Sequence, residues 1–306
     1  MRQDHTTSAE SIHNRRIAGW LFVCCLMVYA MIILGGVTRL TGSGLSMVEW
    51  DPIFGILPPL DQTSWDETFR LYQQSPEYQK INIGMDLEGF KRIYWYEYSH
   101  RVLGRTIGTV FLLPFLFFLV KGWIQRPLIP KLMTMFVLGG LQGLLGWYMV
   151  KSGLVDNPHV SQYRLTAHLG LAILIYGYMF YVALNLWLGD RRTTTVPGGL
   201  RRATTLLTGL VFITTLSGGF VAGLKAGFAY NTFPLMDGHW IPEAIFMQTP
   251  LWRNFFENIA TVQFDHRLLA TLVFFGVIAL WAAARRYSLP ATVNTGLHLM
   301  LAAAIL

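Results

Sequence analysis

The stretch EYSHRVLGRTIGTVFLLPFLFFLV, residues 97–120, decides the class of fold. It begins with polar residues and continues as a mainly apolar segment, Val102–Val120. About 20 apolar residues in a helix are needed to cross the hydrocarbon core of a bilayer, and only a helix satisfies its backbone there. Six further segments have this character: Ile17–Val37, Leu132–Val150, Leu165–Leu188, Ala203–Leu224, Leu268–Ala284 and Leu289–Leu306. We therefore expect an all-α polytopic membrane protein.

The composition of the 306 residues agrees with this class. Hydrophobic residues make up 53% and charged residues 13%, whereas soluble domains have about 45–50% and about 25%. The first apolar segment is too long for the apolar region of a cleaved signal peptide. Its adjacent cysteines, Cys24 and Cys25, are expected to be small buried side chains, and they exclude a disulfide framework.

The net charge of +7 indicates membrane topology and not nucleic-acid binding. Twelve of the 24 basic residues but only three of the 17 acids lie in the N-terminus and in the segments near 121–131, 189–202 and 285–290. By the positive-inside rule these parts are cytoplasmic. The two long loops, about Thr38–Tyr98 and Lys225–Phe264, then face the periplasm, and a helix is expected near Ser64–Gln74. We expect residence in the cell (inner) membrane, no nucleic-acid partner, and function at the outer side.

The chain contains an internal repeat. The pair GG at 35–36 recurs at 218–219, an offset of 183, and EYSHR at 97–101 recurs as QFDHR at 263–267, an offset of 166. The repeat predicts two pseudo-symmetric four-helix bundles. Only three apolar segments follow the midpoint, so an eighth helix is not found; either the chain is a fragment, which we expect, or the second half is naturally short. The two predicted halves are residues 1–188 and 189–306.

Three histidines lie at membrane depth, where an ionisable side chain carries a high free-energy cost. We expect His100 and His266 in the first turns of their helices and His168 one turn inside its helix. An interhelical hydrogen bond would explain one such histidine, but three at one depth favour a shared function. Neutral imidazoles on facing helices suit the two axial positions of a heme iron, whereas zinc is poorly supplied with ligands. His298 is a weaker candidate, and we expect four histidines at the surface: His5, His13, His159 and His239.

Residues near these histidines agree with heme binding. Arg101 and Arg267 could pair with propionates, although arginines also anchor helix ends at a membrane surface. Glu97 precedes His100 by three residues, on the same helical face. It could hold His100 or move a proton, or it could stabilise the start of the helix. Because the second half has Gln263 here, we expect one reactive half and one structural or electron-carrying half.

Six stretches carry a resemblance to a known family. They are GGVTRLTGSGLSMVEWDPIFGILPP (35–59), EYSHRVLGR (97–105), LQGLLGWYMVKSGL (141–154), AHLGLA (167–172), AGFAYNTFPLMDG (226–238) and QFDHR (263–267). Through them the chain resembles heme A synthase, in the branch found in mitochondria and related bacteria. The resemblance implies two bundles with one heme site each. It also implies oxidation of the C8 methyl group of heme O to a formyl group, which gives heme A for cytochrome oxidase.

The resemblance further implies roles for single residues. His100 and His168 would serve the heme O site, with Glu97 as the catalytic carboxylate. His266 would ligate heme b together with a histidine on an eighth helix. The cysteine pair that some bacterial members carry in the first long loop is absent here. Expected partners are heme O, heme O synthase, membrane lipid, further copies of the chain, and an electron donor and acceptor that the sequence does not identify.

Two other classes of protein stay open at this point. A diheme electron-transfer protein linked to quinone would explain paired histidines, but it would not explain a carboxylate in one half only. A transporter would explain the repeat. However, the three histidines are expected near one face of the membrane, which does not fit a binding site at the midplane.

Overall fold

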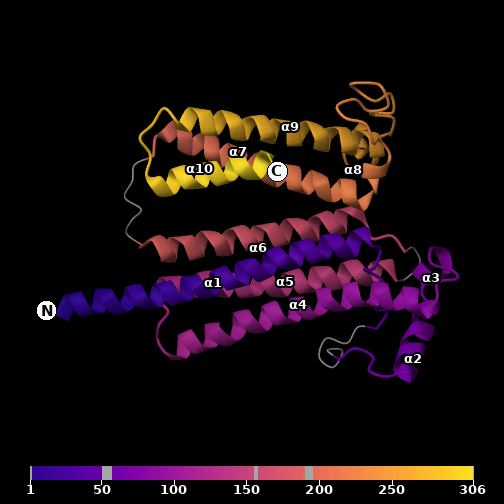
Figure 1. Ribbon diagram of the computed structural model, residues 1–306, viewed down its shortest axis with the longest axis horizontal. Helices are drawn as coiled ribbons and strands as arrows, with labels where there is room; N and C mark the ends of the chain where they lie inside the picture. The colour runs from indigo at the N-terminus through magenta and orange to yellow at the C-terminus, as the bar shows by residue number, and fades with distance from the viewer. Residues whose placement is uncertain (1, 50–56, 155–157, 190–195, 306) are drawn as a thin grey trace. The chain divides into compact units, whose positions relative to one another are not determined.

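A computed structural model describes residues 2–49, 57–154, 158–189 and 196–305, with side chains from residue 10 onward (Figure 1). It contains no β-strand within these residues, and one isolated bridge joins Met236 and His239. Six helices are long and apolar enough to cross a membrane: α1 (Arg2–Leu40), α4 (Leu87–Val120), α5 (Ile129–Gly153), α6 (Gln162–Leu188), α7 (Gly198–Gly223) and α9 (Ile259–Ala284). The prediction of an all-α polytopic membrane protein is confirmed.

The seventh predicted segment, Leu289–Leu306, corresponds to a shorter helix. Helix α10 (Ala291–Ile305) has 15 residues and starts directly after Pro290; Leu306 lies outside the described residues. At 1.5 Å per residue it is about 22 Å long, less than the roughly 30 Å of a hydrocarbon core. By length, the structure therefore bears out six of the seven predicted spans.

Helices α4 and α9, which carry two of the predicted histidines, begin well before their apolar segments. Helix α4 begins at Leu87 instead of Val102, and α9 begins at Ile259 instead of Leu268. The prediction that His100 and His266 lie in the first turns was therefore wrong, since both lie further inside their helices. An apolar segment marks only where a helix is surrounded by apolar groups, whereas the helix itself continues as an amphipathic extension.

The first long loop folds against the start of α4. It contains α2 (Gln62–Gln73), which confirms the helix expected near Ser64–Gln74, and α3 (Pro76–Lys80). Each helix begins at a side chain that accepts a hydrogen bond from its first turn, which replaces a missing backbone partner: Asp61 for α2, Ser75 for α3 and Asp86 for α4. Aromatic side chains of α2 and α4 pack together, and they explain the extension of α4: Trp65, Tyr72, Phe90 and Tyr94. Residues 50–56 of this loop lie outside the described residues.

The chain divides into two compact units. The first comprises Met1–Arg164 and Leu171–Gly189, and the second comprises Leu165–Gly170 and Asp190–Leu306. In the first unit α1 packs along α4, and the indole of Trp20 donates a hydrogen bond of 2.8 Å to the carbonyl of Val110. In the second unit α7 packs along α9. The division into four-helix halves at 188/189 stays a prediction, and residues 190–195 lie outside the described part of the chain.

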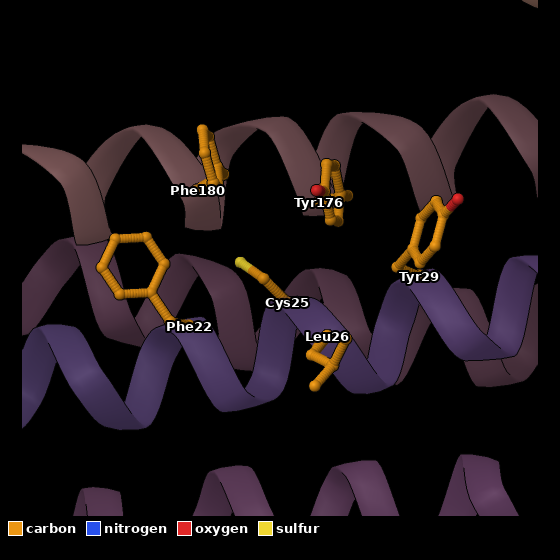
Figure 2. A pocket seen from close by; sticks show the side chains of 6 residues that line it. All are labelled: Phe22, Cys25, Leu26, Tyr29, Tyr176 and Phe180. Atoms are coloured by element: carbon orange, nitrogen blue, oxygen red, sulfur yellow. The ribbon is translucent and has the colours of Figure 1, made fainter. Parts of the chain in front are cut away.

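An apolar hollow lies on the first unit, between α1 and α6 (Figure 2). Its volume is about 240 Å³, and it is lined by Phe22, Cys25, Leu26, Tyr29, Tyr176 and Phe180. The lining carries no histidine or carboxylate, so the hollow is separate from the predicted chemistry. Cys24 and Cys25 are buried and unpaired, which confirms their expected role as small core residues.

Candidate functional site

The repeated motifs form two matched arrangements. The first histidine site comprises Gly35, Glu97, His100 and Arg101, and the second comprises Gly218, Gln263, His266 and Arg267. A Cβ atom placed on Gly35 would lie 3.2 Å from Nε2 of His100, and one on Gly218 would lie 3.1 Å from Cε1 of His266. Both distances are shorter than ordinary contacts. Glycine therefore lets each helix backbone approach the imidazole that faces it.

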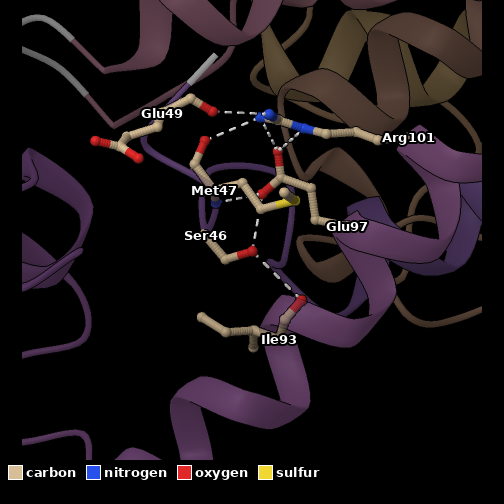
Figure 3. A network of polar contacts seen from close by, with 6 residues as sticks. All are labelled: Ser46, Met47, Glu49, Ile93, Glu97 and Arg101. Carbon is tan, nitrogen blue, oxygen red and sulfur yellow. Dashed lines mark hydrogen bonds and ion pairs between the residues drawn. The ribbon is translucent and has the colours of Figure 1, made fainter. Parts of the chain in front are cut away.

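Glu97 is the centre of a buried polar network (Figure 3). Only 2% of it is exposed. Its Oε2 accepts hydrogen bonds from the Ser46 hydroxyl and the Met47 backbone N–H, both at 2.8 Å. Its Oε1 accepts from Nε and Nη2 of Arg101, at 3.0 and 2.6 Å. Four donors around one side chain match an ionised carboxylate, which accepts hydrogen bonds and donates none.

Arg101 also links the first long loop to α4 through hydrogen bonds. Its Nη2 donates to the carbonyl of Met47 at 2.9 Å, and its Nη1 donates to the carbonyl of Glu49 at 3.2 Å (Figure 3). The guanidinium therefore joins the helix that carries His100 to the loop that follows α1. A planar group with five N–H donors is suited to this, since it can bind a carboxylate and carbonyls at once.

The second histidine site repeats the arginine contacts without the carboxylate. Nη2 of Arg267 donates to the carbonyl of Tyr230 at 2.7 Å, and its Nη1 donates to the carbonyl of Thr232 at 2.6 Å. The amide of Gln263 donates to the same Tyr230 carbonyl at 2.8 Å. A neutral amide thus takes the position that a charged group has in the first site.

His168 lies half-buried in α6. It belongs to Leu165–Gly170, the part of α6 that groups with the second unit, whereas His100 belongs to the first unit. Nearby, a Cβ atom on Gly219 would lie 2.7 Å from Oγ1 of Thr166, so α6 packs closely on α7 at this level. The pairing of His168 with His100 stays a prediction.

The other histidines have different surroundings. His298 is exposed on α10, and its Nδ1 accepts a hydrogen bond from the Trp281 indole at 3.1 Å. His13 stacks on Trp123 with ring centroids 4.6 Å apart. Across the described residues, no three His, Cys, Asp or Glu side chains come together as a metal cluster would require. Each of the two histidine sites contains one imidazole, that of His100 or that of His266.

Two serines of these sites were not predicted from the sequence. Ser46 binds Glu97, and the hydroxyl of Ser217 forms a hydrogen bond of 2.8 Å with Nδ1 of His266. A comparison of the two halves could have found Ser217. It directly precedes the repeated glycine pair, at the position where the first half has Leu34.

These features define a multi-pass membrane protein in which two related histidine sites are built on an internal repeat. The family model of the cytochrome oxidase assembly proteins, COX15-CtaA, matches residues 18–306. The chain therefore belongs to this family, and the resemblance seen in its motifs is confirmed. No solved structure matches the chain.

Relatives named heme A synthase match over most of their length. The protein of Nitrosospira multiformis is 58% identical over 290 residues, which cover 94% of this chain and 82% of the relative. The protein of Nitrosomonas eutropha is 53% identical over 93% of this chain and 81% of its own length. The protein of Parvibaculum lavamentivorans is 51% identical, with coverage of 90% and 79%.

Proposed function

We propose that the chain oxidises the C8 methyl group of heme O to a formyl group and so produces heme A for cytochrome oxidase. Membership in the heme A synthase family makes it an enzyme of heme A biosynthesis. One observation carries the finer proposal. The first histidine site holds a buried carboxylate, Glu97, where the second site holds Gln263.

We assign heme O to the first histidine site, with His100 and His168 as iron ligands, and a heme b cofactor to the second, with His266. The donor set fits a heme, because imidazoles on bundled helices are common axial ligands. The glycine facing each imidazole also fits, since it lets the neighbouring helix backbone pack against the ring and confine the donor. When bound, heme b would supply a route for electrons.

Arg101 and Arg267 are proposed to lie beside the propionates. Each guanidinium sits one residue after a proposed ligand; Arg101 binds two loop carbonyls and Arg267 binds three. A propionate at this position would meet a positive charge that is already fixed by the loop. The same contacts would hold each long loop over its heme and limit the entry of water.

The proposed reaction requires the first site to stabilise positive charge and to accept protons. Conversion of a methyl group to a formyl group takes its oxygen from water and releases four protons and four electrons, and the electrons pass to an acceptor. Positive charge develops on the methyl carbon as electrons leave it. The negative charge of Glu97 would stabilise that charge, because its four hydrogen bonds hold it in place in a buried position. Glu97 is also the carboxylate available to relay protons.

We further propose that the N-terminus is cytoplasmic and that both histidine sites lie toward the periplasmic side of the cell inner membrane. The concentration of basic residues in the N-terminus and the short connections supports this orientation. Heme O would arrive from heme O synthase through the lipid, an electron donor and acceptor would complete the reaction, and copies of the chain would associate as a homo-oligomer.

The substitution Glu97→Gln tests the proposed function. It keeps the size of the side chain and reproduces the second site. We expect the formation of heme A to fall by about 100-fold, as for the loss of a group that stabilises transition-state charge, while heme O or a hydroxylated intermediate accumulates. Extraction and chromatography of the hemes measure this result.

A matched control is Glu88→Gln. Glu88 is exposed in the same helix and pairs with Lys91, so its loss should leave heme A unchanged. A normal yield of heme A from Glu97→Gln, at equal protein level, would remove Glu97 from the reaction.

A further inference from the structure

The hydroxyl of Ser217 lies between two groups of the second unit. Its Oγ is 2.7 Å from the backbone carbonyl of Thr214 and 2.8 Å from Nδ1 of His266. A hydroxyl has one hydrogen, and a carbonyl oxygen can only accept. The hydrogen of Ser217 therefore points to Thr214, and its oxygen accepts a hydrogen bond from the imidazole.

This arrangement determines the tautomer of His266. If Oγ of Ser217 accepts, Nδ1 of His266 must carry the proton. The other ring nitrogen, Nε2, then has a free lone pair, which is the form of imidazole that binds a metal. The backbone at Gly218 confines the ring from a neighbouring direction, since a Cβ atom there would lie 3.1 Å from Cε1.

We propose that Ser217 is a positioning residue that holds His266 in the tautomer and ring orientation needed to ligate heme iron through Nε2. The inference rests on the proposed assignment of heme b to the second histidine site. It adds Ser217 as a residue that contacts the imidazole of His266 and is not itself an iron ligand. Partners of this kind fix ring orientation and raise the basicity of the ligand, and their loss typically costs about 10–100-fold in metal affinity.

The first half of the chain lacks this hydroxyl. The offset of 183 that relates Gly35 to Gly218 relates Leu34 to Ser217, and a leucine side chain cannot accept a hydrogen bond. The difference agrees with the division of roles proposed for the sites. A resident cofactor benefits from a ligand that is oriented in advance, whereas a heme that must enter and leave does not.

The tautomer can be measured without heme. We suggest nitrogen-15 spectra of the full chain, labelled at histidine and prepared heme-free, with His266→Gln to identify the signals of this residue. The signals should show a protonated Nδ1 and an unprotonated Nε2. Ser217→Ala should give a mixture of the two tautomers. A protonated Nε2 in the unaltered chain, or no change in Ser217→Ala, would overturn the inference.

Heme binding gives a second, separate test. Ser217→Ala should lower the affinity for added heme b by about tenfold or more, and Ser217→Thr, which keeps the hydroxyl, should restore it. Thr215→Ala is the matched control, because among the described residues that hydroxyl donates to the Val211 carbonyl of its own helix. The heme affinity of this variant should not change. If His266→Ala loses heme but Ser217→Ala does not, the role of Ser217 is wrong while the assignment of heme b to the second site stands. If His266→Ala retains heme b, the assignment of the second site fails.

Discussion

In the first histidine site Arg101 donates to the carbonyl of Met47 at 2.9 Å, and in the second Arg267 donates to the carbonyl of Tyr230 at 2.7 Å. The two carbonyls are 183 positions apart, the same offset that separates the repeated glycine pairs. The preceding helices also end at this offset, α1 at Leu40 and α7 at Gly223. The two halves therefore share their backbone geometry, including the positions of individual hydrogen bonds.

The sites differ in side chains that do not change this backbone plan. The first has Glu97 and Leu34, and the second has Gln263 and Ser217 at the matching positions. The first site thus has a carboxylate ion-paired with Arg101, while the second has a neutral amide and a hydroxyl bonded to its imidazole. Under the proposed function, these differences assign the reaction to the first site and stable heme binding to the second.

The largest expected effect concerns which site retains heme. His266→Ala should remove most of the heme b from the purified full-length protein, because it deletes the ligand proposed for this cofactor. His100→Ala should keep that heme and lose the formation of heme A. Reduced-minus-oxidised absorbance spectra and heme extraction distinguish the two variants.

His239→Ala provides the control for this experiment, since His239 is exposed in the second long loop, and it should match the unaltered chain. If His266→Ala keeps its heme while His100→Ala is purified empty, the roles of the two sites are reversed.

A smaller effect, on the pH dependence of stability, should come from a buried acid in the first long loop. Among the described residues, no ion pair is found for this acid. Glu77 is 5% exposed, and its carboxylate accepts a hydrogen bond from the Tyr72 hydroxyl at 3.2 Å. Burial, with a contribution from the charge of Glu97, raises the pKa of Glu77 to about 7. The folded protein then binds the proton more tightly than the unfolded chain does. Stability should therefore fall as the pH rises from about 4.5 to about 7, by roughly 2 kcal/mol between pH 5 and pH 8.

Glu77→Gln should remove this part of the pH dependence and stabilise the protein at pH 8, because an amide stays neutral and can still accept from Tyr72. Thermal unfolding in one detergent at both pH values measures it. Glu67→Gln, at an exposed position of α2, is the control and should keep the dependence. An unchanged pH profile in Glu77→Gln would show that Glu77 is not the group that titrates.

The membrane class and most of the helix positions could be predicted from the sequence, because apolar length is a direct requirement of the bilayer. The starts of the helices could not. Helix α4 begins 15 residues before its apolar segment, and the reason is tertiary: Phe90 and Tyr94 pack on Trp65 of α2. Contacts of this kind join residues far apart in the chain, and periodicity alone does not reveal them.

The histidines and Glu97 could be selected from the sequence, since ionisable groups in apolar surroundings are rare. The partners of Glu97 could not. They include the backbone N–H of Met47 and the hydroxyl of Ser46 in a loop 50 positions away. A backbone group carries no sequence signal, and a serine in a loop rich in glycine and serine does not stand out. The tautomer of His266 likewise required the position of a hydroxyl oxygen.

The smallest expected effect concerns the backbone directly after α1 and directly after α7. It tests whether both loops need a residue in the left-handed conformation there. Gly42 follows α1 with φ of +66°, and Lys225, 183 positions later, follows α7 with φ of +54°. Glycine adopts this left-handed conformation freely, whereas a residue with a Cβ is strained there by about 1 kcal/mol. Lys225→Gly should therefore stabilise the second unit, and Gly42→Ala should destabilise the first.

The two variants should shift the unfolding midpoint in opposite directions by about 1–3 °C, as expected for a change near 1 kcal/mol in a chain of this size. No atom lies within 4 Å of a Cβ added at Gly42, so Gly42→Ala reports backbone strain and not a clash. Gly36→Ala is the control, because Gly36 also has open space but lies within α1. There alanine is preferred over glycine, and the midpoint should stay the same or rise. Equal midpoints for Lys225→Gly, Gly42→Ala and the unaltered chain would mean that the shared left-handed turn is not an energetic requirement of either loop.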